Sequence, residues 1–221
     1  MRTVLMGLTM AVAMAAGCTT EKVTGPGPGQ GMLVARLTDA PAPLDSIKAV
    51  NVFVVRVDAR RAPVRDSADV DADLDHHHSF GDDDHGEERS DSAQWVTIAE
   101  PNRAFNLLDL QGGVTAFLGS TPADTGHFKA IRLVIDPAQS SIVLVDGTVL
   151  SMTSTPPVEF ESRGRHALLV EFDDAVDVRE GETTTITLDI RLASSVSLRG
   201  RSVRDGFIFR PVVVGRCEHE H

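Results

Sequence analysis

Aromatic residues and positive charge are both scarce in this sequence. It has no tyrosine, a single tryptophan (Trp95) and 5% aromatic residues among 221. Single-stranded nucleic acids, like many sugars, are held by stacking on aromatic rings, so the chain is poorly equipped for either ligand. Trp95 opens a candidate strand, and we expect it in the core. The net charge of −11 argues against a protein that neutralises phosphates, so no nucleic-acid partner is expected.

Cysteines, long apolar runs and common catalytic motifs are scarce as well. The two cysteines are Cys18 and Cys217, and after the amino-terminal segment no apolar run reaches the ~18 residues of a membrane-spanning helix. The Gly-x-Ser-x-Gly motif of serine hydrolases is missing. Residues 124–126 repeat the Asp-Thr-Gly triplet of aspartic proteases, but they precede a strand and are interpreted as a turn. His127 and His166 open strands and are interpreted as rim residues. We therefore expect no enzyme.

The amino-terminal segment has the pattern of an export signal. Arg2 supplies one positive charge, and residues 4–16 are apolar with no charged side chain. The run Ala15-Ala16-Gly17-Cys18 resembles the bacterial lipobox, where cleavage before the cysteine accompanies its acylation with diacylglycerol and palmitate. The resemblance implies that residues 1–17 are a lipoprotein signal peptide and that Cys18 is the lipid attachment site. The alternative is an ordinary export signal in which Cys18 is incidental.

The next segment, residues 18–31, is rich in glycine and proline and is typical of a tether. Burial of acyl chains contributes ~0.8 kcal/mol per CH₂, and more than one chain anchors a protein stably. The membrane is therefore the expected partner, through Cys18. Thr19 rather than aspartate follows this cysteine. By resemblance to sorting in two-membrane bacteria, this implies a lipid-anchored protein of the cell envelope, at the outer membrane.

The body of the chain, residues 32–216, shows apolar residues with a period of two, which predicts strands in a single domain. Asp146-Gly147 predicts a tight hairpin turn, in which both residues take positive φ. Only residues 113–119 suggest a short helical turn. Many short strands with frequent turns predict an all-β fold, a two-sheet antiparallel β-sandwich. The candidate strands are residues 32–37, 49–57, 94–99, 104–108, 127–135, 141–145, 148–152, 166–172, 183–190 and 207–214.

Four blocks of the body form a recognisable set. They are Leu37-Thr38-Asp39-Ala40-Pro41, residues 105–113 (Phe-Asn-Leu-Leu-Asp-Leu-Gln-Gly-Gly), residues 128–135 and residues 209–213 (Phe-Arg-Pro-Val-Val). These blocks resemble a bacterial lipoprotein family known only as domain-of-unknown-function family 4382. The resemblance implies an exported β-sandwich, often behind a lipobox, and assigns no catalytic residue. Within the first block, we interpret Asp39 as a turn former at the end of a strand.

A strongly acidic insert, residues 66–92, interrupts the body after the second candidate strand. It holds eleven acids and one arginine, a net charge of −10 against −11 for the whole chain. Carboxylates suit Ca²⁺, and neutral imidazoles suit Zn²⁺. The spacing does not fit an EF-hand loop, because Leu74 and Phe80 stand where glycine and glutamate are needed. The candidate metal ligands are Asp69, Asp71, Asp73, Asp75, His76, His77, His78, Asp82, Asp83, Asp84 and His85.

Two interpretations of the insert stay open. One is a disordered, solvated segment without selective metal binding, because the insert is strongly charged and has few apolar residues. The other is capture of a divalent cation, Ca²⁺ or Zn²⁺, which is the only cofactor considered. The polar tail, residues 217–221, raises a similar choice. A frayed end is expected, but a continued strand would put Cys217, His219 and His221 on one face, as three ligands for zinc or copper.

The sequence therefore predicts a lipid-anchored envelope β-sandwich that acts by binding, with capture of divalent cations or of a basic partner by the Asp/His insert. The alternative is a structural or assembly lipoprotein, in which the insert is a solvated spacer without a metal role. Which protein or cation is bound is left open by the residues.

Overall fold

The computed structural model describes residues 25–62, 95–160 and 167–220, and strands dominate this part of the chain. The short helical turns are η2 (Leu107–Leu110), α1 (Leu192–Ser195) and η3 (Val203–Asp205). None of the helices in these ranges is long and apolar enough to cross a membrane. The strands are β1 (Gln30–Thr38), β2 (Ile47–Arg61), β3 (Trp95–Ala99), β4 (Arg103–Asn106), β5 (Ala116–Asp124), β6 (Gly126–Leu144), β7 (Val149–Leu150), β8 (Val158–Phe160), β9 (Ala167–Val178), β10 (Thr183–Ile190), β11 (Val196–Leu198), β12 (Phe207–Phe209) and β13 (Val213–Glu220).

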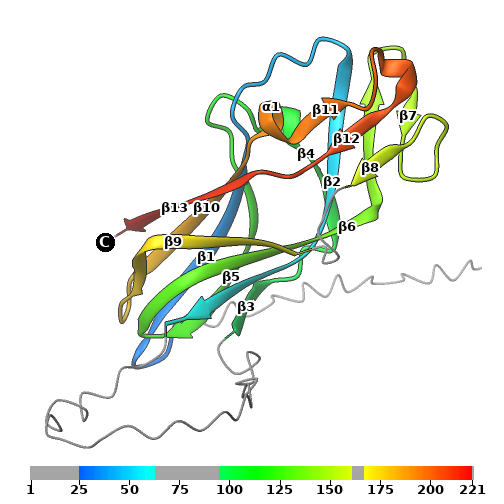
Figure 1. Ribbon diagram of the computed structural model, residues 1–221. Helices are drawn as coiled ribbons and strands as arrows, with labels where there is room; N and C mark the ends of the chain where they lie inside the picture. The colour runs from blue at the N-terminus through cyan, green and yellow to red at the C-terminus, as the bar shows by residue number, and fades with distance from the viewer. Residues whose placement is uncertain (1–24, 63–94, 161–166, 221) are drawn as a thin grey trace, which may run out of the picture.

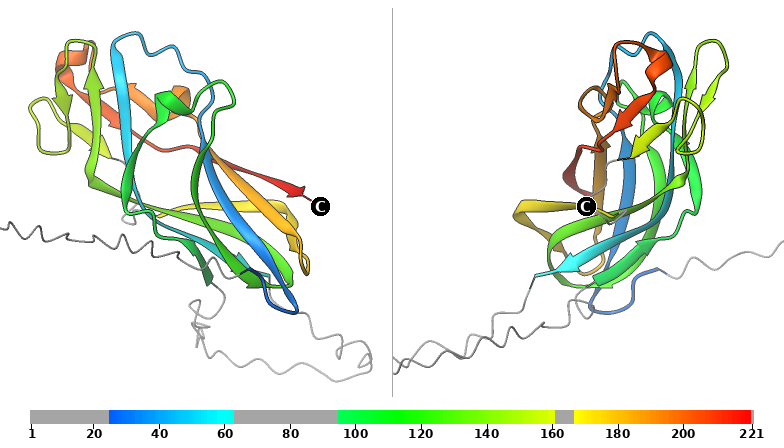
Figure 2. Two further views of the ribbon diagram at one scale, coloured as in Figure 1. Left: turned by 180° about the vertical axis from the view of Figure 1, so that it is seen from behind. Right: turned by 45° about the vertical axis from the view of Figure 1, so that its right-hand side comes forward.

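Two large sheets face each other, as Figures 1 and 2 show. One has the strand order β13-β10-β1-β5, and the other has the order β3-β2-β6-β7, with β4 also pairing with β2 and β9 with β6. A small sheet, β11-β12-β8, lies at one end of the molecule. Apolar side chains at alternate positions meet between the large sheets, among them Leu33, Leu37, Leu133 and Ile186, all fully buried. The predicted all-β sandwich is confirmed.

Two of the strand pairs are parallel, which the simple antiparallel prediction did not include. Strand β1 runs parallel to β10, with Met32 opposite Thr183, and β12 runs parallel to β8. Parallel neighbours need a long crossover connection. Here the connection between β1 and β10 passes through the other sheet, because β2, β6 and β9 lie between them in the sequence. As a result β10 is a central strand, and Thr184, Thr185 and Asp189 on it are buried.

The candidate strands 127–135 and 141–145 form one 19-residue strand, β6. Asp136-Pro137 suggests an interruption, because proline cannot donate a ladder hydrogen bond. The proline is accommodated because the register of β6 against β2 shifts between Asn51 and Phe53. The Ser140 hydroxyl donates to the carbonyl of Asp136 and accepts from the backbone N–H of Phe53. A side chain thus replaces the missing backbone partner, and the strand continues.

The helical turn expected at residues 113–119 is wrong. Residues 116–119 begin β5, which pairs with β1 along its whole length. Gly119 explains how a strand fits there: a Cβ at this position would lie 2.4 Å from the Cβ of Ala99 on β3. The glycine lets β5, the edge of one sheet, come close to β3, the edge of the other. A helix predicted from the flanking glycines alone could not take the contact with β3 into account.

The hairpin predicted at Asp146-Gly147 forms, between β6 and β7, but with a longer loop. The N–H of Leu144 donates to the carbonyl of Thr148, and Gly147 has φ 87°. Asp146 does not have positive φ, so this is not the two-residue turn that was expected. Asp146 instead accepts a hydrogen bond from the backbone N–H of Thr148. The local sequence predicted the hairpin and missed the turn type.

The leader and the acidic insert join the sandwich at the same end. Strand β1 begins at Gln30, β2 ends at Arg61, and β3 begins at Trp95; these three points lie together at the lower end in Figure 1. We call this the leader end. The loop after β1, α1 and the hairpin between β6 and β7 lie at the opposite end.

Candidate functional site

Most of the residues predicted as sites from the sequence lie outside the part of the chain that the structure describes. This holds for the lipid attachment residue Cys18, for all the candidate metal ligands of the acidic insert, and for His166. Within residues 25–62, 95–160 and 167–220, no group of three or more His, Cys, Asp or Glu side chains is placed to hold a metal ion. The described residues instead bring together two clusters of charged side chains that the sequence did not predict.

The first cluster lies on the outer face of the β2 sheet and surrounds Asp58. Arg56 and Arg132 both contact the Asp58 carboxylate, at 3.0 and 2.8 Å, and the Thr97 hydroxyl donates to it at 2.8 Å. The Asp58 side chain is only 2% exposed. The residues come from three neighbouring strands, because Asp58 stands opposite Thr97 on β3 and opposite Arg132 on β6.

Trp95 completes this cluster, which corrects its expected place in the core. The guanidinium carbon of Arg132 lies 4.2 Å from the centroid of the indole ring, and that of Arg60 lies 5.7 Å from it. A guanidinium this close to an indole face is attracted by the ring quadrupole. Arg60 also contacts Glu171 on β9 at 2.9 Å. We call Arg56, Arg60, Trp95 and Arg132 the arginine–tryptophan face.

The arginine–tryptophan face adjoins the leader end. Trp95 is the first residue after the gap in the described chain, and Arg60 stands opposite it in the ladder. The side chains of Arg56, Arg60 and Arg132 keep 40%, 26% and 28% of their surface exposed. The alternation Arg56-x-Asp58-x-Arg60 is the signal that could have shown this face, because residues two apart in a strand share one side.

The second cluster lies at the opposite end and is centred on Asp39. Its carboxylate accepts a hydrogen bond from the backbone N–H of Leu192 at 3.0 Å and one from the Gln111 side-chain amide at 2.8 Å. The backbone N–H of Asp39 donates to the Leu110 carbonyl. Asp39 is 2% exposed. It is therefore more than the turn former expected at the end of β1, since it ties that end to η2 and to α1.

Burial raises the pKa of Asp39 above its usual value of 3.8, because the charged form is poorly solvated inside the protein. The hydrogen bonds from Leu192 and Gln111 act in the opposite direction, and the negative charge of Asp189 raises the pKa further. Three of the four blocks that resemble family 4382 meet here: Asp39 comes from the first and Gln111 from the second. The fourth block contributes the Val212 carbonyl, which accepts from the N–H of Arg191 next to Leu192.

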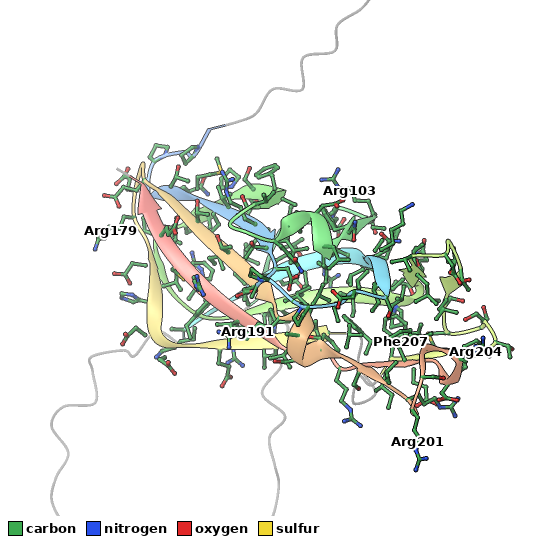
Figure 3. All side chains as sticks on the ribbon, turned by 90° about the horizontal axis from the view of Figure 1, so that it is seen from above. Arg103, Arg179, Arg191, Arg201, Arg204 and Phe207 are labelled. Carbon is green, nitrogen blue, oxygen red and sulfur yellow. The ribbon has the colours of Figure 1, made fainter. Side chains whose placement is uncertain are left out.

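Asp189, on β10, is the other buried carboxylate at this end. Arg191 and Arg216 approach one of its oxygens at 3.9 Å each, a long distance for an ion pair. Among the described residues its other oxygen, Oδ1, is buried without a hydrogen-bond partner. Figure 3 shows Arg191 near the middle of the molecule, beside α1. Within the described residues, no third metal-ligand side chain joins Asp39 and Asp189.

The turn and rim expected around residue 126 are seen. Thr125 connects β5 to β6, which begins at Gly126 with φ 147°. His127 is 67% exposed in its side chain, and its Nδ1 lies 2.6 Å from Asp177. This is a surface pair, and no nucleophilic side chain is hydrogen-bonded to it within the described part of the chain. It gives no support to catalysis by His127.

The carboxyl end is not frayed at residue 217, contrary to expectation. Strand β13 continues to Glu220, paired with β10, and Cys217 stands opposite Ile186. Cys217 packs against the hydrophobic core, and burial raises the pKa of its thiol to about 11. The continued strand therefore does not offer Cys217 as a surface ligand.

Together, these features define an all-β sandwich with an acidic insert at one end and a buried carboxylate junction at the other. The chain belongs to the family described as Domain of unknown function (DUF4382), whose match spans residues 30–211. No curated protein and no solved structure matches it.

Proposed function

We propose that this protein is a lipid-anchored binding protein of the bacterial cell envelope, attached through Cys18 and acting through its acidic insert. The observation that carries the proposal is the common end of the sandwich from which the leader and the insert depart. A lipid at Cys18 would place the eleven carboxylates of the insert near the membrane surface. Anionic lipid surfaces concentrate divalent cations there, which favours Ca²⁺ or Zn²⁺ as the species captured.

Removal of the insert is the direct test of cation capture. Because Arg60 pairs with Trp95 across the junction, deletion of residues 66–92 leaves a six-residue loop, residues 62–65 and 93–94, between two paired strands. The deletion variant is therefore expected to fold. In calorimetric titrations with Ca²⁺ and with Zn²⁺, we expect binding heat from the full mature chain and none from the variant. Equal heats from the two proteins would overturn cation capture by the insert.

Attachment to the membrane is tested independently at Cys18. The substitution Cys18→Ala removes the thiol that accepts the lipid, so the protein is expected to move from the membrane fraction to the soluble fraction. The loss should be nearly complete, because the acyl chains on Cys18 supply the attachment. Mass spectrometry of the purified wild-type protein checks the modification itself. An unmodified Cys18 in membrane-derived protein would refute the anchor.

A structural lipoprotein with a spacer insert is the second candidate, and the closed β2–β3 ladder favours it. Arg60 pairs with Trp95 in the β2–β3 ladder, so the described residues on either side of the insert are joined directly to each other. If the insert is only a spacer, deletion of residues 66–92 should leave the heat of cation titration and the stability of the protein unchanged. The membrane attachment through Cys18 would persist. The two titrations above therefore separate the candidates.

A further inference from the structure

The outer face of the β2 sheet carries hydrogen-bonding capacity that the described residues do not use. A guanidinium has five N–H donors. Of these, Arg56 uses Nε on Asp58, Arg132 uses Nε and Nη2 on Asp58, and Arg60 uses Nη2 on Glu171. The other guanidinium N–H groups of these three residues make no side-chain hydrogen bond within the described ranges. All three side chains are partly exposed, so the face can receive carboxylates.

Trp95 supplies an independent observation. Its indole Nε1–H is buried and has no hydrogen-bond acceptor among the described residues. A buried donor without an acceptor costs about 1–3 kcal/mol, so such groups in folded proteins are normally paired. Carboxylate oxygens are strong acceptors for an indole N–H. The face therefore combines unused cationic donors with an unpaired neutral donor, and both suit an anionic partner rich in carboxylates.

A source of further carboxylates adjoins this face in the sequence of the chain itself. The acidic insert is joined to β2 just after Arg61 and to β3 just before Trp95, so it is tethered at both ends beside this face. Its 27 residues carry a net charge of −10. Half of that length spans up to roughly 45 Å when extended, ample for contact with the adjoining strands. Tethering also gives a local concentration on the order of millimolar, so weak charge pairs suffice.

We propose that the acidic insert, residues 66–92, docks in the same molecule on the arginine–tryptophan face, with carboxylates on Arg60, Arg132 and the Trp95 indole N–H. This contact goes beyond the proposed function and needs neither the lipid nor a metal. Docking and cation capture then compete for the same carboxylates, because a carboxylate that binds Ca²⁺ or Zn²⁺ no longer contacts the face. Salt should release the insert as well, because it screens charge pairs that lie at the protein surface.

The single tryptophan makes the contact measurable. Acrylamide quenching of Trp95 fluorescence in the mature chain is expected to be low at low salt and to rise with NaCl. At high salt it should reach the value of the variant that lacks residues 66–92, whose own quenching should not depend on salt. A salt-independent value equal to that of the deletion variant would overturn the docking.

Substitutions locate the contact. Arg60→Gln should raise quenching at low salt toward the deletion value, and Asp82→Asn, Asp83→Asn and Asp84→Asn together should do the same from the side of the insert. The matched control is Arg201→Gln, because Arg201 projects from the other end of the molecule in Figure 3 and should leave quenching unchanged. Equal effects of Arg60→Gln and Arg201→Gln would contradict the assigned face.

The metal titration separates this inference from cation capture. If Ca²⁺ and Zn²⁺ give no binding heat but quenching still depends on salt and on the insert, docking stands and cation capture fails. If the cations bind the insert while quenching is the same with and without residues 66–92, capture stands and docking fails. Circular dichroism of each variant shows that the sandwich is intact.

Discussion

The substitution Asp39→Ala is expected to lower the free energy of unfolding by about 2–5 kcal/mol, because one buried and one partly buried donor lose their acceptor. These donors are the backbone N–H of Leu192 and the side-chain amide of Gln111. The substitution weakens the junction of three elements at once, since Asp39 joins the end of β1 to η2 and α1. Urea unfolding at pH 7, followed by circular dichroism, measures it.

Asp39→Asn is the control that separates hydrogen bonding from charge. Asparagine can accept from Leu192 through its oxygen and donate to Gln111 once that amide turns over, so both hydrogen bonds persist. The variant should unfold near the wild-type free energy or above it at pH 7, because no charge is buried. A loss as large as that of Asp39→Ala would show that the negative charge itself holds the junction.

The pH dependence of stability follows from the raised pKa of Asp39. The folded protein binds the proton more tightly than the unfolded chain, so this group contributes stability that is fully present below its usual pKa of 3.8. That contribution is lost as the pH rises through the folded pKa. The stability difference between Asp39→Asn and the wild type should therefore grow as the pH rises across this range. A difference that shrinks instead would contradict the raised pKa.

The sequence predicted the strands that depend on local pattern and missed the contacts between distant segments. Period-two apolar runs located β1, β2, β10 and the core they build, because alternate side chains face one side of a strand. The role of Asp39 was hidden because Gln111 and Leu192 lie 72 and 153 residues away from it. A residue at the end of a strand, before Ala-Pro, has the same local sequence whether its side chain faces solvent or a buried donor.

Trp95 shows the same limit for a surface cluster. Size and apolarity favour the core for tryptophan, but two arginines from β2 and β6 cover its ring on the outer face. Both arginines were visible in the sequence, and so was the charged alternation in β2. Their common partner could be recognised only from the register, which puts Arg60 opposite Trp95 and Asp58 opposite Arg132.

Gly119→Ala is expected to destabilise the fold by about 2–4 kcal/mol, from backbone strain together with overpacking. Gly119 has φ +155°, a conformation that side chains rarely adopt, and a Cβ there would lie 2.4 Å from the Cβ of Ala99. Removing this overlap requires β5 to move away from β3, which opens one side of the sandwich. The free energy of unfolding in urea, for the variant and the wild type, measures the loss.

Two further variants divide that loss into its parts. Gly147→Ala changes a glycine with φ +87° and no atom within 4 Å of the new Cβ, so only the backbone cost of roughly 1–2 kcal/mol is expected. The double variant Gly119→Ala/Ala99→Gly removes the opposing Cβ and should recover the steric share of the loss, leaving the backbone share. If the double variant is no more stable than Gly119→Ala alone, the close approach of β5 to β3 does not set the requirement for glycine.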